Sequence, residues 1–199
     1  MFILGLTGSI GMGKSATAKM FAEAGVPVHD ADAVVHALYE GEATPAIEAA
    51  FPGTTKNGKV DRTELGKRAL GDEAAIKKLE AMVHPLVALA RERFLDEAKS
   101  KGAAVAVLDI PLLYETGGDA GCDAVVVVSA PSDIQRQRAF ERPGMTDAKL
   151  AAILAKQLPD EEKRRRADFV VDTSQGFDTA RAQVRDILAR VATMPKRRR

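Results

Sequence analysis

The chain has 199 residues, 46% of them hydrophobic, and a formal net charge of +1 at pH 7. This length and composition suit one globular domain with room for an inserted subdomain. The balanced charge argues against nucleic acid as a partner, and no stretch approaches the roughly 20 apolar residues of a membrane span. The single cysteine, Cys122, cannot form an internal disulfide, so we expect a reducing, cytoplasmic setting without a signal peptide. Nothing in the sequence indicates an oligomeric state.

The first predicted strand, residues 2–6, runs into a glycine-rich turn and then into a helical pattern over 16–22. The turn, Gly8-Ser9-Ile10-Gly11-Met12-Gly13-Lys14-Ser15, fits the phosphate-binding P-loop. Its backbone N–H groups can converge on phosphate oxygens at the positive end of the helix dipole. Lys14 is predicted to reach the β- and γ-phosphates, and the Ser15 hydroxyl to bind Mg²⁺. The loop indicates a nucleoside triphosphate but not the group that receives the phosphate.

Four more apolar segments are predicted strands, at 26–29, 104–108, 124–128 and 169–171. Continuous runs such as Val125-Val126-Val127-Val128 are typical of a parallel sheet that is covered on both faces. Helical patterns lie between the strands and indicate βαβ crossovers. The sequence therefore predicts an α/β fold with a five-stranded parallel sheet.

The long interval between the second and third strands is predicted to be helical. Its predicted helices are 31–39, 45–50, 62–70 and 72–99, the last with a break at Pro85. Such an all-helical insertion suggests a small substrate-binding subdomain. A second helical interval, 132–167, is rich in arginine.

Two strands are predicted to end in acids. Asp30 and Asp32 close the second strand, at the sheet edge where the P-loop also lies. One could accept the proton of an acceptor hydroxyl, and one could organise water on Mg²⁺ or cap the helix from Ala33. Asp109 ends the third strand and is a candidate metal ligand through water, although turn chemistry explains it equally well.

Other segments keep two interpretations open. Pro111 to Glu115 could contact the acceptor or cover the core, and His84 beside Pro85 fits a helix kink with a surface histidine. Arg138 and Arg142 are predicted lid cations that stabilise developing charge. The run from Lys163 to Arg166 either contacts ligand or forms a solvated face.

In this order the motifs resemble the dephospho-CoA kinase family over nearly the whole chain. Beyond the P-loop and Val28 to Asp32, the resemblance rests on these segments: Asn57 to Arg62, Leu79-Glu80, His84 to Val87, Pro111 to Glu115, Gln135 to Arg138, Arg142, Gln157, Glu162-Lys163 and Ala167 to Asp172. The P-loop alone is shared with many NTPases, whereas the ordered set is specific.

The resemblance implies a three-layer P-loop kinase fold in a single domain over 1–199. A helical acceptor-binding insertion at about 33–100 and an arginine-rich lid at about 136–160 belong to that expectation. The implied reaction is ATP-dependent phosphorylation of the ribose 3′-hydroxyl of dephospho-CoA, the last step of coenzyme A synthesis, with Mg²⁺. Another small-molecule or nucleotide P-loop kinase is the alternative. The implied partners are ATP and dephospho-CoA, with no nucleic acid and no membrane.

The resemblance also assigns roles to residues. The predicted catalytic residues are Asp32, Lys14 and Arg138, and the predicted metal ligand is Ser15, with Asp109 kept as a candidate from its place at the end of the third strand. The implied ATP-binding residues are Gly11, Met12, Gly13, Lys14, Ser15, Ala16 and Arg142. The implied dephospho-CoA-binding residues are Asp32, His36, Arg62, His84 and Leu113. Ala16 and Thr173 depart from frequent family residues, and we expect neither departure to matter.

Overall fold

The computed structural model describes residues 1–69 and 71–197. The chain forms two compact units. The sheet unit contains Met1–His29 and Ala98–Arg199, and the inserted unit contains Asp30–Glu97. Within the described ranges, no helix combines the length and the apolar character that crossing a membrane requires.

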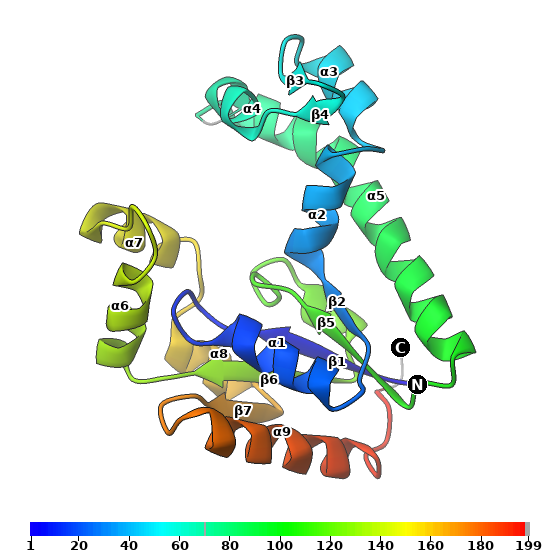
Figure 1. Cartoon of the computed structure of the whole chain (residues 1–199), viewed down its shortest axis with the longest axis vertical. Helices are drawn as coiled ribbons and strands as arrows, with labels where there is room; N and C mark the ends of the chain where they lie inside the picture. The colour runs from blue at the N-terminus through cyan, green and yellow to red at the C-terminus, as the bar shows by residue number, and fades with distance from the viewer. Residues whose placement is uncertain (70, 198–199) are drawn as a thin grey trace. The chain divides into compact units, whose positions relative to one another are not determined.

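The sheet unit is built on five strands in the order β2-β5-β1-β6-β7 (Figure 1). Their bounds are β1 Phe2–Thr7, β2 Val28–Asp30, β5 Val105–Asp109, β6 Ala124–Ser129 and β7 Phe169–Asp172. β1 pairs in parallel with β5 and β6, and β6 pairs in parallel with β7. Every residue of β6 is buried, which explains its unbroken valine run. The predicted α/β fold with a five-stranded parallel sheet is confirmed.

Five α-helices and a 3₁₀ turn complete the sheet unit as described. They are α1 Lys14–Glu23, η1 Gly118–Gly121, α6 Ser132–Phe140, α7 Asp147–Leu154, α8 Asp160–Arg166 and α9 Phe177–Val191. α1 and α9 lie next to each other and share one core with the strands (Figure 1). Phe21 of α1, Leu4 of β1 and Val184 of α9 belong to that core, and each has almost no exposed surface.

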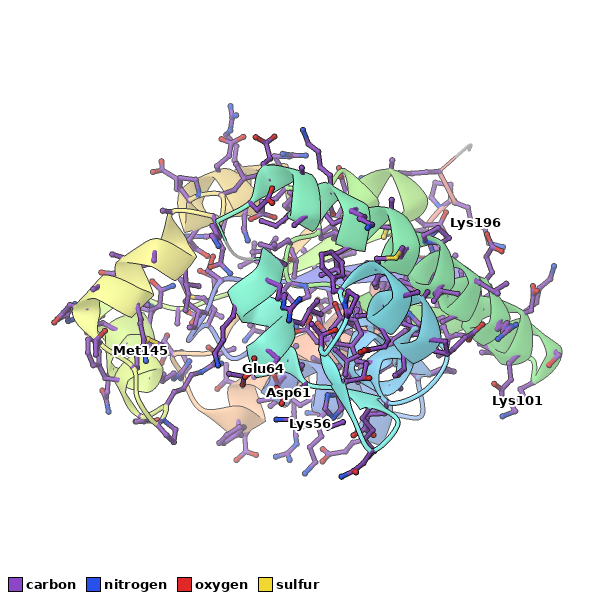
Figure 2. All side chains as sticks on the ribbon, turned by 90° about the horizontal axis from the view of Figure 1, so that it is seen from above. Lys56, Asp61, Glu64, Lys101, Met145 and Lys196 are labelled. Atoms are coloured by element: carbon purple, nitrogen blue, oxygen red, sulfur yellow. The ribbon has the colours of Figure 1, made fainter. Side chains whose placement is uncertain are left out.

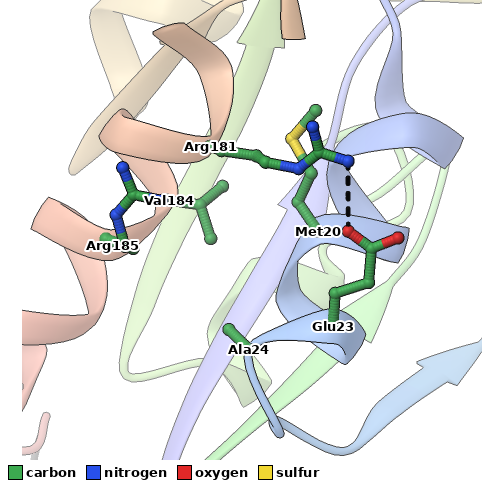
Figure 3. Close-up of a pocket in the computed structure, with 6 residues that line it drawn as sticks. All are labelled: Met20, Glu23, Ala24, Arg181, Val184 and Arg185. Atoms are coloured by element: carbon green, nitrogen blue, oxygen red, sulfur yellow. Dashed lines mark hydrogen bonds and ion pairs between the residues drawn. The ribbon is translucent and has the colours of Figure 1, made fainter. Parts of the chain in front are cut away.

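A shallow groove separates the two helices at the surface (Figure 3). It has a volume of about 250 Å³ and is lined by Met20, Glu23, Ala24, Arg181, Val184 and Arg185. Arg181 Nη2 lies 3.4 Å from Glu23 Oε2, so an ion pair bridges α9 and α1 there.

β7 is an edge strand of the sheet, and a side chain of α9 covers its last residue. The backbone N–H of Asp172 donates to Gln183 Oε1 at 2.9 Å. Gln183 Nε2 donates in turn to the Asp172 carbonyl at 2.9 Å. One amide side chain therefore satisfies both backbone groups of Asp172.

The inserted unit has its own hydrophobic core. Its elements are α2 Ala31–Tyr39, α3 Thr44–Ala50, β3 Thr55–Lys56, β4 Lys59–Val60, α4 Arg62–Ala69 and most of α5 Glu73–Ser100. Its core is formed by Leu38, Ala43, Ile47, Phe51, Val60, Leu65 and Val83. Because each helix contributes to this cluster, the unit buries its apolar faces against one another.

The prediction of an all-helical insertion is wrong. β3 and β4 form an antiparallel hairpin whose turn is Asn57-Gly58. The φ angles of Asn57 and Gly58 are 53° and 76°, and a two-residue hairpin turn of this kind favours Asn-Gly. Lys56 Nζ lies 3.0 Å from Asp61 Oδ2, an ion pair that joins the hairpin to the start of α4 (Figure 2).

The predicted break at Pro85 is also wrong, because α5 continues through that residue. Proline lacks one backbone N–H, so it removes one hydrogen bond while the turns on both sides remain helical. The bounds predicted for α2 match those of the structure, and the predicted helix 62–70 ends at Ala69, with Leu70 outside the described residues. The predicted helical interval 132–167 consists of three separate helices.

Candidate active site

The loop between β1 and α1 has the conformation that its glycines permit. Gly11 and Gly13 have φ angles of 79° and 93°, a region that side chains other than glycine rarely adopt. A Cβ atom at Gly11 would lie 2.5 Å from the Gln135 carbonyl oxygen. At Gly13 it would lie 3.1 Å from Thr173 Cγ2. Glycine is therefore required at both positions by backbone conformation and by close neighbours.

Lys14 and Asp109 lie together at the carboxyl edge of the sheet. Lys14 Nζ is 2.6 Å from Asp109 Oδ1, and only 3% of the Asp109 side chain is exposed. A buried carboxylate needs such a partner because desolvation strongly disfavours an isolated charge. The structure thus brings two predicted site residues together, with Asp109 fixing the direction of the Lys14 side chain.

Three further loop residues differ in exposure. Ser15 is exposed in the first turn of α1, and Ala16 is half-buried. Met12 is buried, and its Sδ accepts the Ala130 N–H at 3.1 Å. The Met12 side chain therefore anchors the loop to the end of β6, so a contact with nucleotide would come from its backbone.

No group of three or more His, Cys, Asp or Glu side chains suited to a metal occurs among the described residues. Mg²⁺ in a P-loop protein needs few protein ligands, because substrate phosphates and water complete its shell. The exposed hydroxyl of Ser15 and the buried carboxylate of Asp109 are hard oxygen donors of the required type. This donor set fits Mg²⁺ bound together with a nucleotide.

Two glutamines hold the tip of the loop. Gln135 Nε2 donates to the Ile10 carbonyl at 2.9 Å. The Ile10 N–H donates to Gln157 Oε1 at 3.3 Å. Gln135 lies in α6 and Gln157 follows α7, so side chains from both ends of the predicted lid segment bind one loop residue.

Arg138 reaches the loop through an intermediate residue. Its Nη1 donates to Thr173 Oγ1 at 2.7 Å, and its Nη2 donates to the Thr173 carbonyl at 2.8 Å. Thr173 Oγ1 donates to the Met12 carbonyl at 2.8 Å. Thr173 was not among the predicted site residues, and its signal in the sequence was its departure from the residue that is frequent in the family. Arg142, two residues beyond α6, is exposed.

The basic run contains one buried residue that charge patterning did not predict. Lys163 is fully buried, and its Nζ lies 2.9 Å from Glu115 Oε1. The Leu158 N–H donates to the same oxygen at 2.8 Å. Burial would raise the pKa of Glu115, but the contacts from Lys163 and Leu158 outweigh burial and lower it. Lys163 is thus a structural ion-pair partner, whereas Arg165 pairs with Glu162 at the surface.

Leu113 lies in the core of the sheet unit. Its side chain has no exposed surface and packs against Gly5. The segment from Pro111 to Glu115 was predicted either to contact the acceptor or to cover the core. Because Leu113 is buried, it covers the core, and we do not propose it as a residue that binds the acceptor. The next residue, Tyr114, is also buried, and burial raises its pKa to about 12.

The two acids after the second strand differ in what they bind. Asp30 Oδ1 accepts the Ala33 N–H at 3.0 Å, so Asp30 is the N-cap of α2. Asp32 is exposed in the first turn of α2, and its side chain has no hydrogen bond or ion pair with the residues that the structure describes. Capping therefore explains Asp30 and leaves Asp32 available for another role.

Apart from the buried Leu113, the predicted acceptor-binding residues are exposed in the inserted unit. His36 Nε2 lies 3.8 Å from Glu40 Oε1, which Lys59 also approaches at 2.9 Å. Arg62 is the first residue of α4. Burial raises the pKa of Tyr39, and the nearby positive charge of Arg62 opposes that rise. His84 lies exposed on α5.

Known proteins match this chain along its length. The dephospho-CoA kinase family model matches residues 2–179. The dephospho-CoA kinase of Rhodopseudomonas palustris (strain BisB18) is 65% identical over 198 residues, which cover 100% of both chains. The crystal structure of TT1252 from Thermus thermophilus has a TM-score of 0.83 at 32% identity, covering 96% of this chain and 97% of that one. The dephospho-CoA kinase of Campylobacter jejuni has the same fold, with a TM-score of 0.65 at 24% identity over 95% and 96% of the two chains. The chain belongs to the dephospho-CoA kinase family.

Proposed function

We propose that this kinase phosphorylates the ribose 3′-hydroxyl of dephospho-CoA. We call the predicted ATP-binding residues of the sheet unit the donor half and the predicted acceptor-binding residues of the inserted unit the acceptor half. The observation that carries the proposal is the pairing of Lys14 with the buried Asp109 beside a glycine-rich loop. Phosphoryl transfer depends mainly on positioning and electrostatic stabilisation, and a fixed cation at a phosphate-binding loop supplies both.

In the donor half, Lys14 binds the β- and γ-phosphates of ATP, and the backbone N–H groups of Gly11 to Ala16 surround them. Ser15 and Asp109 would hold Mg²⁺. When bound, the ion neutralises charge on the β- and γ-phosphate oxygens. Arg138 and Arg142 act as cations of the lid, at about 136–160, and stabilise the charge of the transferring group.

In the acceptor half, Asp32 accepts a hydrogen bond from the 3′-hydroxyl and takes its proton. Two observations support this role. Asp30 already caps α2, so capping does not explain Asp32. Asp32 also follows β2 closely, and the carboxyl ends of strands line the ligand crevice of open α/β sheets.

The remaining acceptor contacts come from the predicted insertion, at about 33–100. His36, Arg62 and His84 are exposed, and dephospho-CoA carries an anionic diphosphate that such side chains recognise. The sequence contains one cysteine, Cys122, so no internal disulfide can form, which fits a reducing cytoplasm as the compartment of the reaction.

The test is a panel of acceptors with Mg-ATP and the full-length chain. ADP release is measured with dephospho-CoA, AMP, CMP, dTMP and shikimate, and the position of the new phosphate is identified by NMR. We expect dephospho-CoA to be used far faster than the others and to gain phosphate at the 3′ position. K14A, purified in parallel, should lose the activity and so exclude a contaminating kinase. Equal turnover of AMP or shikimate would instead favour another small-molecule kinase.

A further inference from the structure

We infer that Thr173 is a positioning residue for ATP, because its hydroxyl joins Arg138 to the backbone of the P-loop. The inference rests on the proposed nucleotide site and goes beyond the roles assigned there. Thr173 is 9% exposed and touches the loop at Gly13. It follows β7, and its own N–H donates to the Ser129 carbonyl at 3.0 Å, so its backbone is fixed to the sheet.

The hydroxyl of Thr173 has one proton, and its neighbours determine where that proton goes. Arg138 can only donate, so Thr173 Oγ1 accepts from Arg138 Nη1 at 2.7 Å. Two backbone carbonyls can accept the hydroxyl proton, that of Met12 at 2.8 Å and that of Ser129 at 3.4 Å, and the shorter distance directs the proton to Met12. A charged donor strengthens such a hydrogen bond, and it polarises the hydroxyl toward its own acceptor.

Holding the Met12 carbonyl also fixes the next N–H. The Met12 carbonyl and the Gly13 N–H belong to one planar trans peptide and point in opposite directions. Gly13 has a φ angle of 93° and no side chain, so rotation of this peptide meets little steric resistance. Thr173 supplies the resistance and keeps the Gly13 N–H directed away from the Met12 carbonyl.

This arrangement couples two parts of the nucleotide site. The same hydroxyl that orients the loop peptide also receives Arg138, whose Nη2 is fixed by the Thr173 carbonyl at 2.8 Å. Loss of the hydroxyl would free the peptide and remove one of two bonds that hold the guanidinium. ATP affinity should therefore depend on Thr173 although Thr173 itself need not touch the nucleotide.

The test compares T173V with T173S by calorimetric titration of Mg-ATP without acceptor, together with steady-state kinetics. T173V keeps the shape and loses the hydroxyl, so Kd and KM for ATP should rise about tenfold or more, while KM for dephospho-CoA stays near the wild-type value. T173S keeps the hydroxyl and should restore ATP binding. The matched control is T193V, since Thr193 is exposed and its hydroxyl donates to the Arg190 carbonyl at the end of α9.

A double-mutant cycle with R138M tests whether Arg138 and Thr173 act together through their hydrogen bond or whether T173V only disturbs the local packing. If the two residues act as one unit, T173V should weaken ATP binding much less in the R138M background than in the wild type. Unchanged ATP affinity in T173V, failure of T173S to restore it, or additive effects would each overturn the inference. If circular dichroism shows that T173V does not fold, T173A replaces it. Because the titration needs no acceptor, a failed acceptor panel would refute the proposed function without deciding this test.

Discussion

The predicted donor residues and the predicted acceptor residues of this kinase differ in how they are held. In the sheet unit, Lys14 is tied to Asp109, and Arg138 is tied to Thr173 by two hydrogen bonds. In the inserted unit, Asp32 and His84 are exposed. Side chains that are already oriented lose little entropy when a ligand binds, whereas exposed ones must be ordered by it. Lys14 and Arg138 on the predicted donor side are thus preorganised by the protein itself, whereas Asp32 and His84 on the predicted acceptor side would be ordered by their ligand.

Buried charge follows the same division. Among the described residues, the buried Asp and Lys side chains all belong to the sheet unit, namely Asp109, Asp123 and Lys163. The buried polar side chains described in the inserted unit are threonines, Thr44 and Thr54. Buried ions need specific partners and tolerate substitution poorly. We therefore expect substitution of the buried charges of the sheet unit to affect stability, and substitution of the exposed predicted site residues of the inserted unit to affect turnover with little effect on stability.

The largest expected effect tests the acceptor side. D32N keeps the shape of the side chain but cannot take a proton, so kcat should fall about 10²–10⁴-fold. The free energy of unfolding and the affinity for ATP should stay near wild-type values, because Asp32 is exposed and α2 keeps its cap. Stopped-flow or coupled kinetics and a urea titration measure the two quantities. A variant with wild-type kcat would show that Asp32 has no part in proton transfer.

The second expected effect tests the sheet unit. E115Q leaves the fully buried Lys163 without its counter-charge, so the free energy of unfolding should fall by about 3–5 kcal/mol at neutral pH. Urea denaturation gives the value. E115Q combined with K163M removes both charges and should recover much of the loss, and a double variant as unstable as E115Q would contradict the ion-pair explanation.

The same variant gives a pH signature. The pKa of Glu115 is lower in the folded state than its ordinary value. Its ionised form therefore contributes stability that is complete above the unfolded pKa, about 4.3, and is lost as the pH falls through the lower folded pKa. E115Q should remove this part of the acid sensitivity. Urea titrations between neutral pH and pH 3 should show the wild-type and E115Q stabilities converging as the pH falls.

The smallest expected effect concerns the helix cap. D30A removes the acceptor for the Ala33 N–H and should destabilise the start of α2 by about 1 kcal/mol. D30N keeps an acceptor oxygen and serves as the matched control. Hydrogen exchange at the Ala33 amide should be faster in D30A than in D30N. Equal exchange rates would show that the side chain of Asp30 does not protect this amide.

Local patterns predicted much of this molecule. Continuous valine runs identified β6, and the bounds of α2 were predicted from its sequence alone. The hairpin at Thr55 to Val60 was not predicted, although Asn57-Gly58 is typical of such a turn. Each strand has only two residues, which is too short to show the alternation of apolar and polar residues that identifies a strand. Pro85 was given too much weight, since one lost hydrogen bond does not end a helix that continues for many residues on both sides.

The parts that could not be predicted depend on contacts between distant segments. A lysine within Lys163 to Arg166 looks solvated until the fold brings Glu115 against it. Thr173 looks like a minor departure until its hydroxyl is seen between Arg138 and the Met12 carbonyl. Such roles depend on three-dimensional partners, which local composition does not specify.

The amide of Gln183 has a consequence for how this protein behaves at high concentration. An edge strand with unpaired N–H and carbonyl groups can recruit a strand from another molecule and grow into an aggregate. At Asp172 both groups are already bound by Gln183, so an incoming strand would first have to displace that side chain. Gln183 thereby blocks the backbone groups of Asp172, the last residue of β7, from pairing with a strand of another molecule. The strand keeps its full length.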